Sequence, residues 1–127
     1  MERFLWIGLC GALGTWVRYL VAQATARLFG TAFPYGTLIV NLVGCFLMAA
    51  VMHVALTTTR ISETMRFALA TGFLGGLTTY SAFNFETTKL ASDGFSARAA
   101  LYFGLTVVGC LVAGFAGLVV ARRIVGA

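Results

Sequence analysis

The sequence predicts an all-α integral membrane protein with four membrane-crossing helices, surrounded by membrane lipid. Of its 127 residues, 60% are hydrophobic and only 10% are charged, whereas soluble domains carry roughly 25% charged residues. So small a polar surface could not cover a water-exposed globule. Because a helix needs about 20 residues to cross about 30 Å of hydrocarbon, the chain has room for four or five crossings in one membrane domain. No length remains for a separate soluble domain.

Four apolar stretches separated by polar turns define the expected crossings. They cover residues 4–29, 35–56, 63–91 and 96–121. Gly30 and Pro34 interrupt the chain after the first stretch, a polar run at 57–60 follows the second, and a turn at 92–94 follows the third. Four crossings place both chain ends on the same side of the membrane.

The basic residues at the ends of the expected crossings favour neither orientation strongly. An excess of Lys and Arg normally marks the cytoplasmic side. Five basic residues lie on one side and three on the other: Arg3, Arg60, Arg66, Arg122 and Arg123 against Arg27, Lys89 and Arg98. This balance permits insertion in both orientations, and hence an antiparallel pair of identical chains, without requiring it.

Several function classes have no support in the sequence. The net charge is +5, but the basic residues form no cluster or stripe that could follow a phosphate backbone, which argues against nucleic acid as a partner. The cysteines are isolated in apolar runs without metal-site or disulfide spacing. No nucleophile with a base, metal cluster or carboxylate pair indicates an enzyme.

The middle of the third stretch predicts an interrupted helix. Residues 71–79 read TGFLGGLTT, and each glycine weakens a helix by about 1 kcal/mol relative to alanine. We expect a break near residues 75–79. Unpaired backbone groups in lipid cost several kcal/mol each, so a break must be buried in protein or face water or an ion. A continuous helix whose glycines allow close packing is the alternative.

Aromatic residues follow the expected break. Tyr80 and Phe83 are three residues apart and share one face of a helix. The edge of an aromatic ring is electropositive, so rings presented edge-on to a passage would favour an anion. Ordinary core packing is the commoner reason for such a pair, and the spacing does not separate the two.

Polar side chains inside the first and second stretches are candidates for a transport site. Asn41 offers two N–H donors at membrane depth, although asparagine also serves as a link between helices. Arg18 within a crossing costs about 2.5–3.5 kcal/mol unless water or a partner reaches it. We expect Arg18 to lie in an aqueous vestibule, with Glu86 either as its partner or as a separate vestibule residue.

The fourth stretch carries two distinct faces. Gly109, Ala113 and Gly117 form a row of small residues that lets another helix approach closely. A mildly polar track also repeats every four residues, consisting of Tyr102, Thr106, Cys110 and Gly114. The track fits either an ion path or ordinary hydrogen bonding between helices.

Together these segments resemble the Fluc (CrcB) family of fluoride channels. The resemblance rests on GALG at 11–14 followed by Arg18, PYGT at 34–37 leading to NLVG at 41–44, and TGFLGGLTT at 71–79. It covers nearly the whole chain with the segments in the same order. The 71–79 stretch is long enough to be fairly specific.

This resemblance implies a fluoride-selective channel that exports cytoplasmic fluoride passively and thereby lowers its toxicity. It implies an antiparallel, dual-topology homodimer in the inner membrane of a prokaryote, with two pores along the subunit interface. It also implies a structural sodium ion at the dimer centre, held by the backbone carbonyls of Gly75 and Thr78. The implied pore residues are Asn41, Tyr80, Ser81, Phe83, Tyr102, Thr106 and Cys110, and the implied vestibule residues are Arg18 and Glu86.

The sequence departs from the family pattern at two of these positions. Tyr80 stands where phenylalanine is usual, and its hydroxyl needs a partner or could itself donate to fluoride. Cys110 replaces the usual serine of the polar track and is a weaker donor. Both changes affect the expected conductance and ion path rather than the assignment.

Two other classes of membrane protein compete with this interpretation. A small multidrug-type proton-coupled exporter is also a four-helix antiparallel dimer, but it depends on an acidic residue within its first crossing. Here that crossing carries Arg18, and the nearest carboxylate is Glu2 at its start. A non-transporting subunit of a larger complex is the other, and it would show no ion flux when reconstituted alone.

Overall fold

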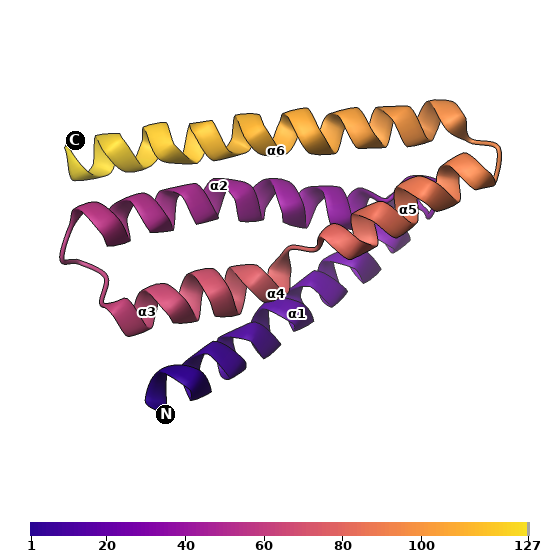
Figure 1. Cartoon of the computed structure of the whole chain (residues 1–127). Coiled ribbons are helices and arrows are strands. Elements are labelled where there is room, and N and C mark those ends of the chain that lie inside the picture. Colours follow the sequence, from indigo (N-terminus) through magenta and orange to yellow (C-terminus); the bar gives the residue numbers. More distant parts are fainter. Residues whose placement is uncertain (127) are drawn as a thin grey trace.

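The computed structural model describes residues 1–126, and these are helical apart from short turns (Figure 1). No β-strand occurs in this part of the chain. Three long helices account for the first, second and fourth expected crossings, and the third is divided into four consecutive segments. The bounds are α1 Glu2–Phe29, α2 Tyr35–Thr57, α3 Glu63–Phe67, the π-helical η1 Ala68–Leu74, α4 Gly75–Leu77, α5 Tyr80–Ser92 and α6 Ser96–Val125.

Three of these helices are long and apolar enough to cross a membrane. They are α1, α2 and α6, with 28, 23 and 30 residues. The segments of the third crossing are each too short to qualify alone, because the helix is interrupted. Large apolar side chains cover the outer surface, including Trp16 at 64% and Phe115 at 70% exposure. Such a surface is typical of a chain that lies in hydrocarbon.

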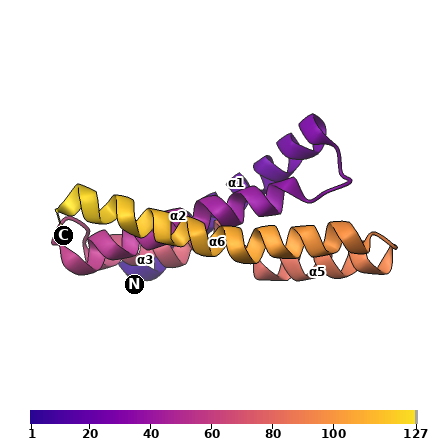
Figure 2. The same cartoon turned by 90° about the horizontal axis from the view of Figure 1, so that it is seen from above.

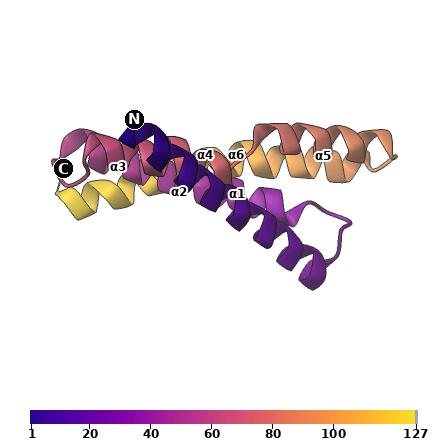
Figure 3. The same cartoon turned by 90° about the horizontal axis from the view of Figure 1, so that it is seen from below.

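α2, α6 and the α3–α4 part of the third crossing run nearly parallel, whereas α1 and α5 lie at an angle to them, and both ends of the chain lie at the same end of the molecule (Figure 1). The α2–α3 connection lies at that end as well, and the α1–α2 and α5–α6 turns lie at the other. The end of α1 and the start of α2 diverge from α5 and α6 when the molecule is seen from above or below (Figures 2 and 3). A pocket described below lies between these two pairs of helix ends.

Glycines bring α1 against the interrupted crossing. A Cβ added at Gly14 would collide with the backbone oxygen of Phe73, and one added at Gly76 would collide with the backbone oxygen of Gly11. At Gly72 it would lie 2.8 Å from the backbone oxygen of Ile7. The glycines at these positions therefore serve close packing of two helix backbones.

This packing predicts that Gly14→Ala strongly destabilises the protein. The added methyl group meets backbone that cannot rotate away, and overpacking of this kind costs about 1–3 kcal/mol. Gly8→Ala is the matched control in the same helix, because nothing lies within 4 Å of a Cβ there. Alanine should stabilise that position by up to about 1 kcal/mol through its helix propensity. Thermal unfolding midpoints in detergent would measure both, and equal midpoints would contradict the packing argument.

The row of small residues on α6 lets another helix approach closely, as the sequence predicted, and the structure identifies that helix as α2. A Cβ at Gly109 would lie 2.9 Å from the Leu42 side chain, and one at Gly117 would collide with the backbone oxygen of Phe46. A Cβ at Gly114 would lie 3.9 Å from the backbone oxygen of Cys45. The closeness of α2 and α6 thus depends on glycines spread along two turns of α6.

Candidate ion pathway

The third crossing is interrupted at two threonines. Thr78 and Thr79 have extended backbone, with φ −91° and ψ 156° and with φ −154° and ψ 122°, respectively. Thr79 begins α5 as its N-cap, because its Oγ1 accepts a hydrogen bond from the backbone N–H of Ala82 at 3.2 Å. The break therefore falls within the predicted 75–79 region, but Gly75 and Gly76 themselves lie in the short helix α4.

Asn41 of α2 pairs with the backbone of the break. Its Oδ1 accepts from the N–H of Thr79 at 2.9 Å, and its Nδ2 donates to the carbonyl of Thr79 at 3.1 Å. Asn41 is 8% exposed. A buried amide thus replaces the helical acceptor that the Thr79 N–H has lost, and it adds a second donor to the Thr79 carbonyl. One of its two N–H groups is committed to this pair, and the other is available for a further partner.

The same contacts release two backbone carbonyls. In an unbroken helix the carbonyl of Gly75 would accept from the N–H of Thr79, and that of Thr78 from the N–H of Ala82. The first N–H instead donates to Asn41 and the second to the Thr79 hydroxyl. Carbonyls freed where a membrane helix unwinds are suitable ligands for sodium. The two predicted sodium ligands therefore fit that role.

Arg18 supports the break from α1. Its Nε donates to the carbonyl of Gly76 at 2.9 Å, an oxygen that would bond Tyr80 N–H in a continuous helix. Within residues 1–126 of one chain no ion pair joins Arg18 to Glu86, so the two residues do not form the pair that the sequence left open. The guanidinium is occupied by the backbone near the end of α4, and this explains how a half-buried arginine is tolerated there.

Glu86 instead belongs to a polar cluster between three helices. Its carboxylate accepts from the Thr37 hydroxyl at 3.1 Å and from the Tyr102 hydroxyl at 3.2 Å. Tyr102 is fully buried. The cluster connects α2, α5 and α6. Sequence reasoning did not include Thr37 among the site residues, although its position four residues before Asn41 places it on the same face of α2.

Aromatic rings lie next to this cluster. The Phe83 ring is 6% exposed and meets the Tyr102 ring at 5.3 Å with a 66° tilt. The Tyr80 ring lies 5.8 Å from Phe83 in an edge-to-face arrangement, but Tyr80 is 79% exposed. Edge-to-face contacts present the positive edge of one ring to the face of another. Only one ring of the predicted pair is thus enclosed within a single chain.

Two hydroxyl groups of the predicted pathway lie close to these rings in the sequence. Thr106 follows Tyr102 by one turn of α6 and is 6% exposed; its Oγ1 is buried and has no hydrogen-bond partner in the described part of the chain. Ser81 is exposed, and its Oγ lies 3.2 Å from the Thr79 Oγ1. A buried hydroxyl without a partner is costly and uncommon. Thr106 is therefore the clearest candidate for a donor to a bound ion.

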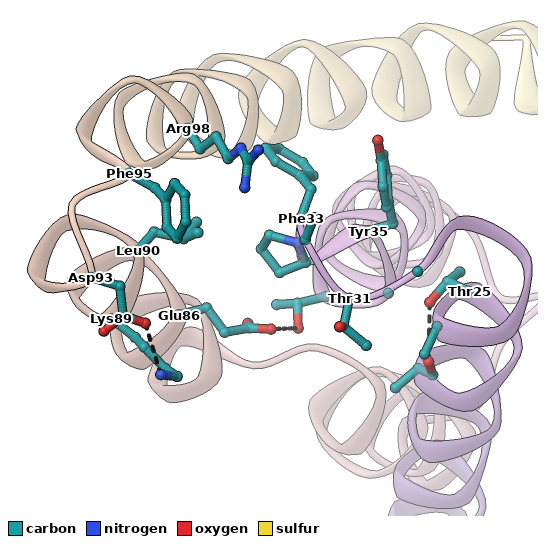
Figure 4. Close-up of a pocket in the computed structure, with 17 residues that line it drawn as sticks. Thr25, Thr31, Phe33, Tyr35, Glu86, Lys89, Leu90, Asp93, Phe95 and Arg98 are labelled. Carbon is teal, nitrogen blue, oxygen red and sulfur yellow. Dashed lines mark hydrogen bonds and ion pairs between the residues drawn. The ribbon is translucent and has the colours of Figure 1, made fainter.

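A pocket opens at the end of the molecule where the helix pairs diverge (Figure 4). Its volume is about 520 Å³, and Thr37 and Glu86 lie at its wall. Its rim carries an ion pair in which Lys89 Nζ lies 2.9 Å from Asp93 Oδ2. Arg98 extends toward the same space, with its guanidinium 4.5 Å from the Phe95 ring. The pocket gives water a route to the polar cluster.

Cys110 lies further along α6, away from that pocket. It lines a second, mostly apolar pocket of about 630 Å³ between α2 and α6. Neither pocket contains a conventional metal site, because no three His, Cys, Asp or Glu side chains come together within residues 1–126. A cation could only be held by backbone carbonyls, by fewer such side chains, or by more than one copy of the chain.

Comparison with known proteins places these features in one family. Residues 5–118 match the family described as CrcB-like protein, Camphor Resistance (CrcB). The chain is 48% identical to the fluoride-specific ion channel FluC of Sorangium cellulosum (strain So ce56), over 98% of each chain. It is 46% identical to the protein of the same name from Geobacter sp. (strain M21), over 98% of this chain and all of the other. The chain therefore belongs to the CrcB family.

Proposed function

We propose that this protein is a fluoride-selective channel that lets cytoplasmic fluoride leave the cell passively. The observation that carries the proposal is the 48% identity, over 98% of both chains, to a protein named as a fluoride-specific ion channel. Relatives at 46% and 45% identity carry the same name. Passive export would lower the toxicity of fluoride that accumulates in the cytoplasm.

The enclosed polar groups offer a physical basis for selectivity. Fluoride is small and strongly hydrated, so a selective path must replace its water by fixed donors. Among residues 1–126 the Thr106 hydroxyl has no hydrogen-bond partner, and Asn41 retains one N–H. The edges of Phe83 and Tyr80 would add weak positive potential. Because these donors carry no formal charge, they would hold the anion loosely enough to release it.

A second copy of the chain would complete the site. Gly75 and Thr78 supply two free carbonyls from one chain, and a symmetric partner would supply two more for a central sodium ion. Tyr80, one ring of the predicted pore pair, is 79% exposed in a single chain and would be covered by a second copy. The small difference in basic charge between the two sides permits an antiparallel, dual-topology homodimer. The bacterial sources of the relatives favour the inner membrane as its location.

Electrical driving force distinguishes this channel from a proton-coupled exporter. An inside-negative potential is worth about 2.3 kcal/mol per charge per 100 mV and drives an anion outward. Purified protein in liposomes loaded with potassium fluoride should release fluoride only when valinomycin lets potassium balance the charge. A fluoride electrode follows the release. Release that ignores voltage and follows an imposed pH gradient would contradict a passive channel, whereas proton movement coupled to a drug would favour the multidrug-type exporter.

A further inference from the structure

The register of α2 against α6 brings together two cysteines that are far apart in the sequence. On α2, Leu42 packs against Gly109 of α6. Three residues later, the backbone oxygen of Cys45 lies next to Gly114 of α6. Cys110 lies between these two glycines on α6. Cys45 and Cys110 therefore lie at a similar level of the α2–α6 contact, and both line one pocket between these helices. Both are reduced and only half-buried.

The two thiols share one groove. Cys45 and Cys110 line the 630 Å³ pocket between α2 and α6, and Met48 and Met52 line it on the α2 side. The remaining wall is mainly apolar, from residues such as Leu111 and Phe115. Two thiols and two thioethers in an apolar groove form a sulfur-rich site with few oxygen ligands. Cys10 is not part of it.

Sulfur ligands of this kind select soft metal ions. Thiolates and thioethers bind soft ions and disfavour hard ones such as magnesium. When two thiols bind Hg²⁺, two S–Hg bonds form and two protons are released, so that the product is neutral. A neutral complex avoids the cost of placing a charge in an apolar groove. A two-coordinate ion therefore fits two cysteines without a third ligand.

We propose that Cys45 and Cys110 form a dithiol site that binds a soft, two-coordinate metal ion between α2 and α6. The site lies one helical turn beyond Thr106 on the polar track of α6. A metal ion there would bridge two helices next to the predicted path of the anion. If the protein conducts fluoride as proposed above, binding should also block flux.

Thiol protection in the wild-type protein tests the site directly. One equivalent of Hg²⁺ per reduced chain is added, the free thiols are labelled with a maleimide after denaturation, and the labelled cysteines are located by mass spectrometry. We expect Cys45 and Cys110 to lose labelling together while Cys10 stays labelled. Independent labelling of Cys45 and Cys110, or protection that includes Cys10 equally, would overturn the site. This readout needs no variant that could fail to fold.

Matched cysteine variants then separate binding from flux. Hg²⁺ affinity should fall at least about 100-fold in Cys45→Ser, and remain unchanged in Cys10→Ser, because a single thiol loses the chelate. Undiminished affinity in Cys45→Ser would overturn the site. In liposomes, Hg²⁺ should block fluoride release by wild type and by Cys10→Ser, with recovery after dithiothreitol. If Hg²⁺ protects the two thiols but does not block fluoride release, the site does not lie beside the ion path. If the protein releases no fluoride even before Hg²⁺ is added, the proposed function alone is contradicted.

Discussion

Phe83→Ile is expected to abolish fluoride flux while the protein remains folded. Phe83 is the enclosed ring of the pathway, in contact with Tyr80 on one side and Tyr102 on the other. Isoleucine fills much of the volume but lacks a positive ring edge, so the change removes an electrostatic contact more than it removes packing. We expect the rate measured with a fluoride electrode to fall at least about 100-fold, equivalent to roughly 2.7 kcal/mol.

Phe85→Ile is the matched control for this change. Phe85 lies two residues further along α5 and is 65% exposed, so its ring does not enter the enclosed cluster. Flux should stay within about twofold of wild type, a change of roughly 0.4 kcal/mol. Wild-type flux in Phe83→Ile would move the ion path away from this ring, and equal loss in both variants would point to a general effect on α5.

Asn41→Ala is expected to lower the free energy of unfolding and to abolish fluoride flux. The substitution removes the acceptor of the part-buried Thr79 N–H, which lies at 2.9 Å, and one donor to the Thr79 carbonyl, which lies at 3.1 Å. A donor left without a partner costs about 1–3 kcal/mol, so the free energy of unfolding should fall by about that amount. The change also deletes one of the proposed donors to fluoride. Thermal unfolding in detergent and fluoride efflux from liposomes measure the two effects.

Asn84→Ala controls for the loss of an amide. Asn84 is an exposed residue of α5, so its replacement should change the free energy of unfolding by no more than about 0.5 kcal/mol. Asn41→Ala with wild-type stability would show that the break does not depend on this amide. If Asn41→Ala is destabilised but still conducts fluoride like wild type, Asn41 supports the break but is not part of the ion path.

The sequence predicted an interruption of the third crossing but not how it is held. The glycines at 75 and 76 indicated a weak helix, yet the extended residues are Thr78 and Thr79. The position is set by Asn41, which is 38 residues away, and by Arg18, which is 58 residues from its acceptor Gly76. Helix propensity is a local property, and it cannot report on partners at that distance.

The two interpretations of the glycines turned out to apply to different positions. Gly72 and Gly76 allow close packing against α1, whereas nothing but the backbone oxygen of Ala70 lies near Gly75. The π-helical turn of η1 had no signal in the sequence pattern. Close packing of backbones depends on which helices cross, and only the folded chain decides this.

Residue roles were hardest to predict where side chains from different helices meet. Glu86 was considered as a partner of Arg18, but it pairs with Thr37 and Tyr102. Cys45 and Cys110 had no informative spacing, yet the register of α2 and α6 brings both of them to one pocket. Periodicity places a residue on a face of its own helix. Periodicity does not show which residues of another helix that face will contact.

The ratio of fluoride to chloride permeability tests the central claim most directly. Liposomes containing only the purified protein would be loaded with either potassium salt, and efflux would be started with valinomycin and followed with ion-selective electrodes. Uncharged donors fixed around a narrow path should favour fluoride by at least about 100-fold, or roughly 2.7 kcal/mol in the barrier. Equal rates for the two anions would contradict a fluoride-selective path through this break.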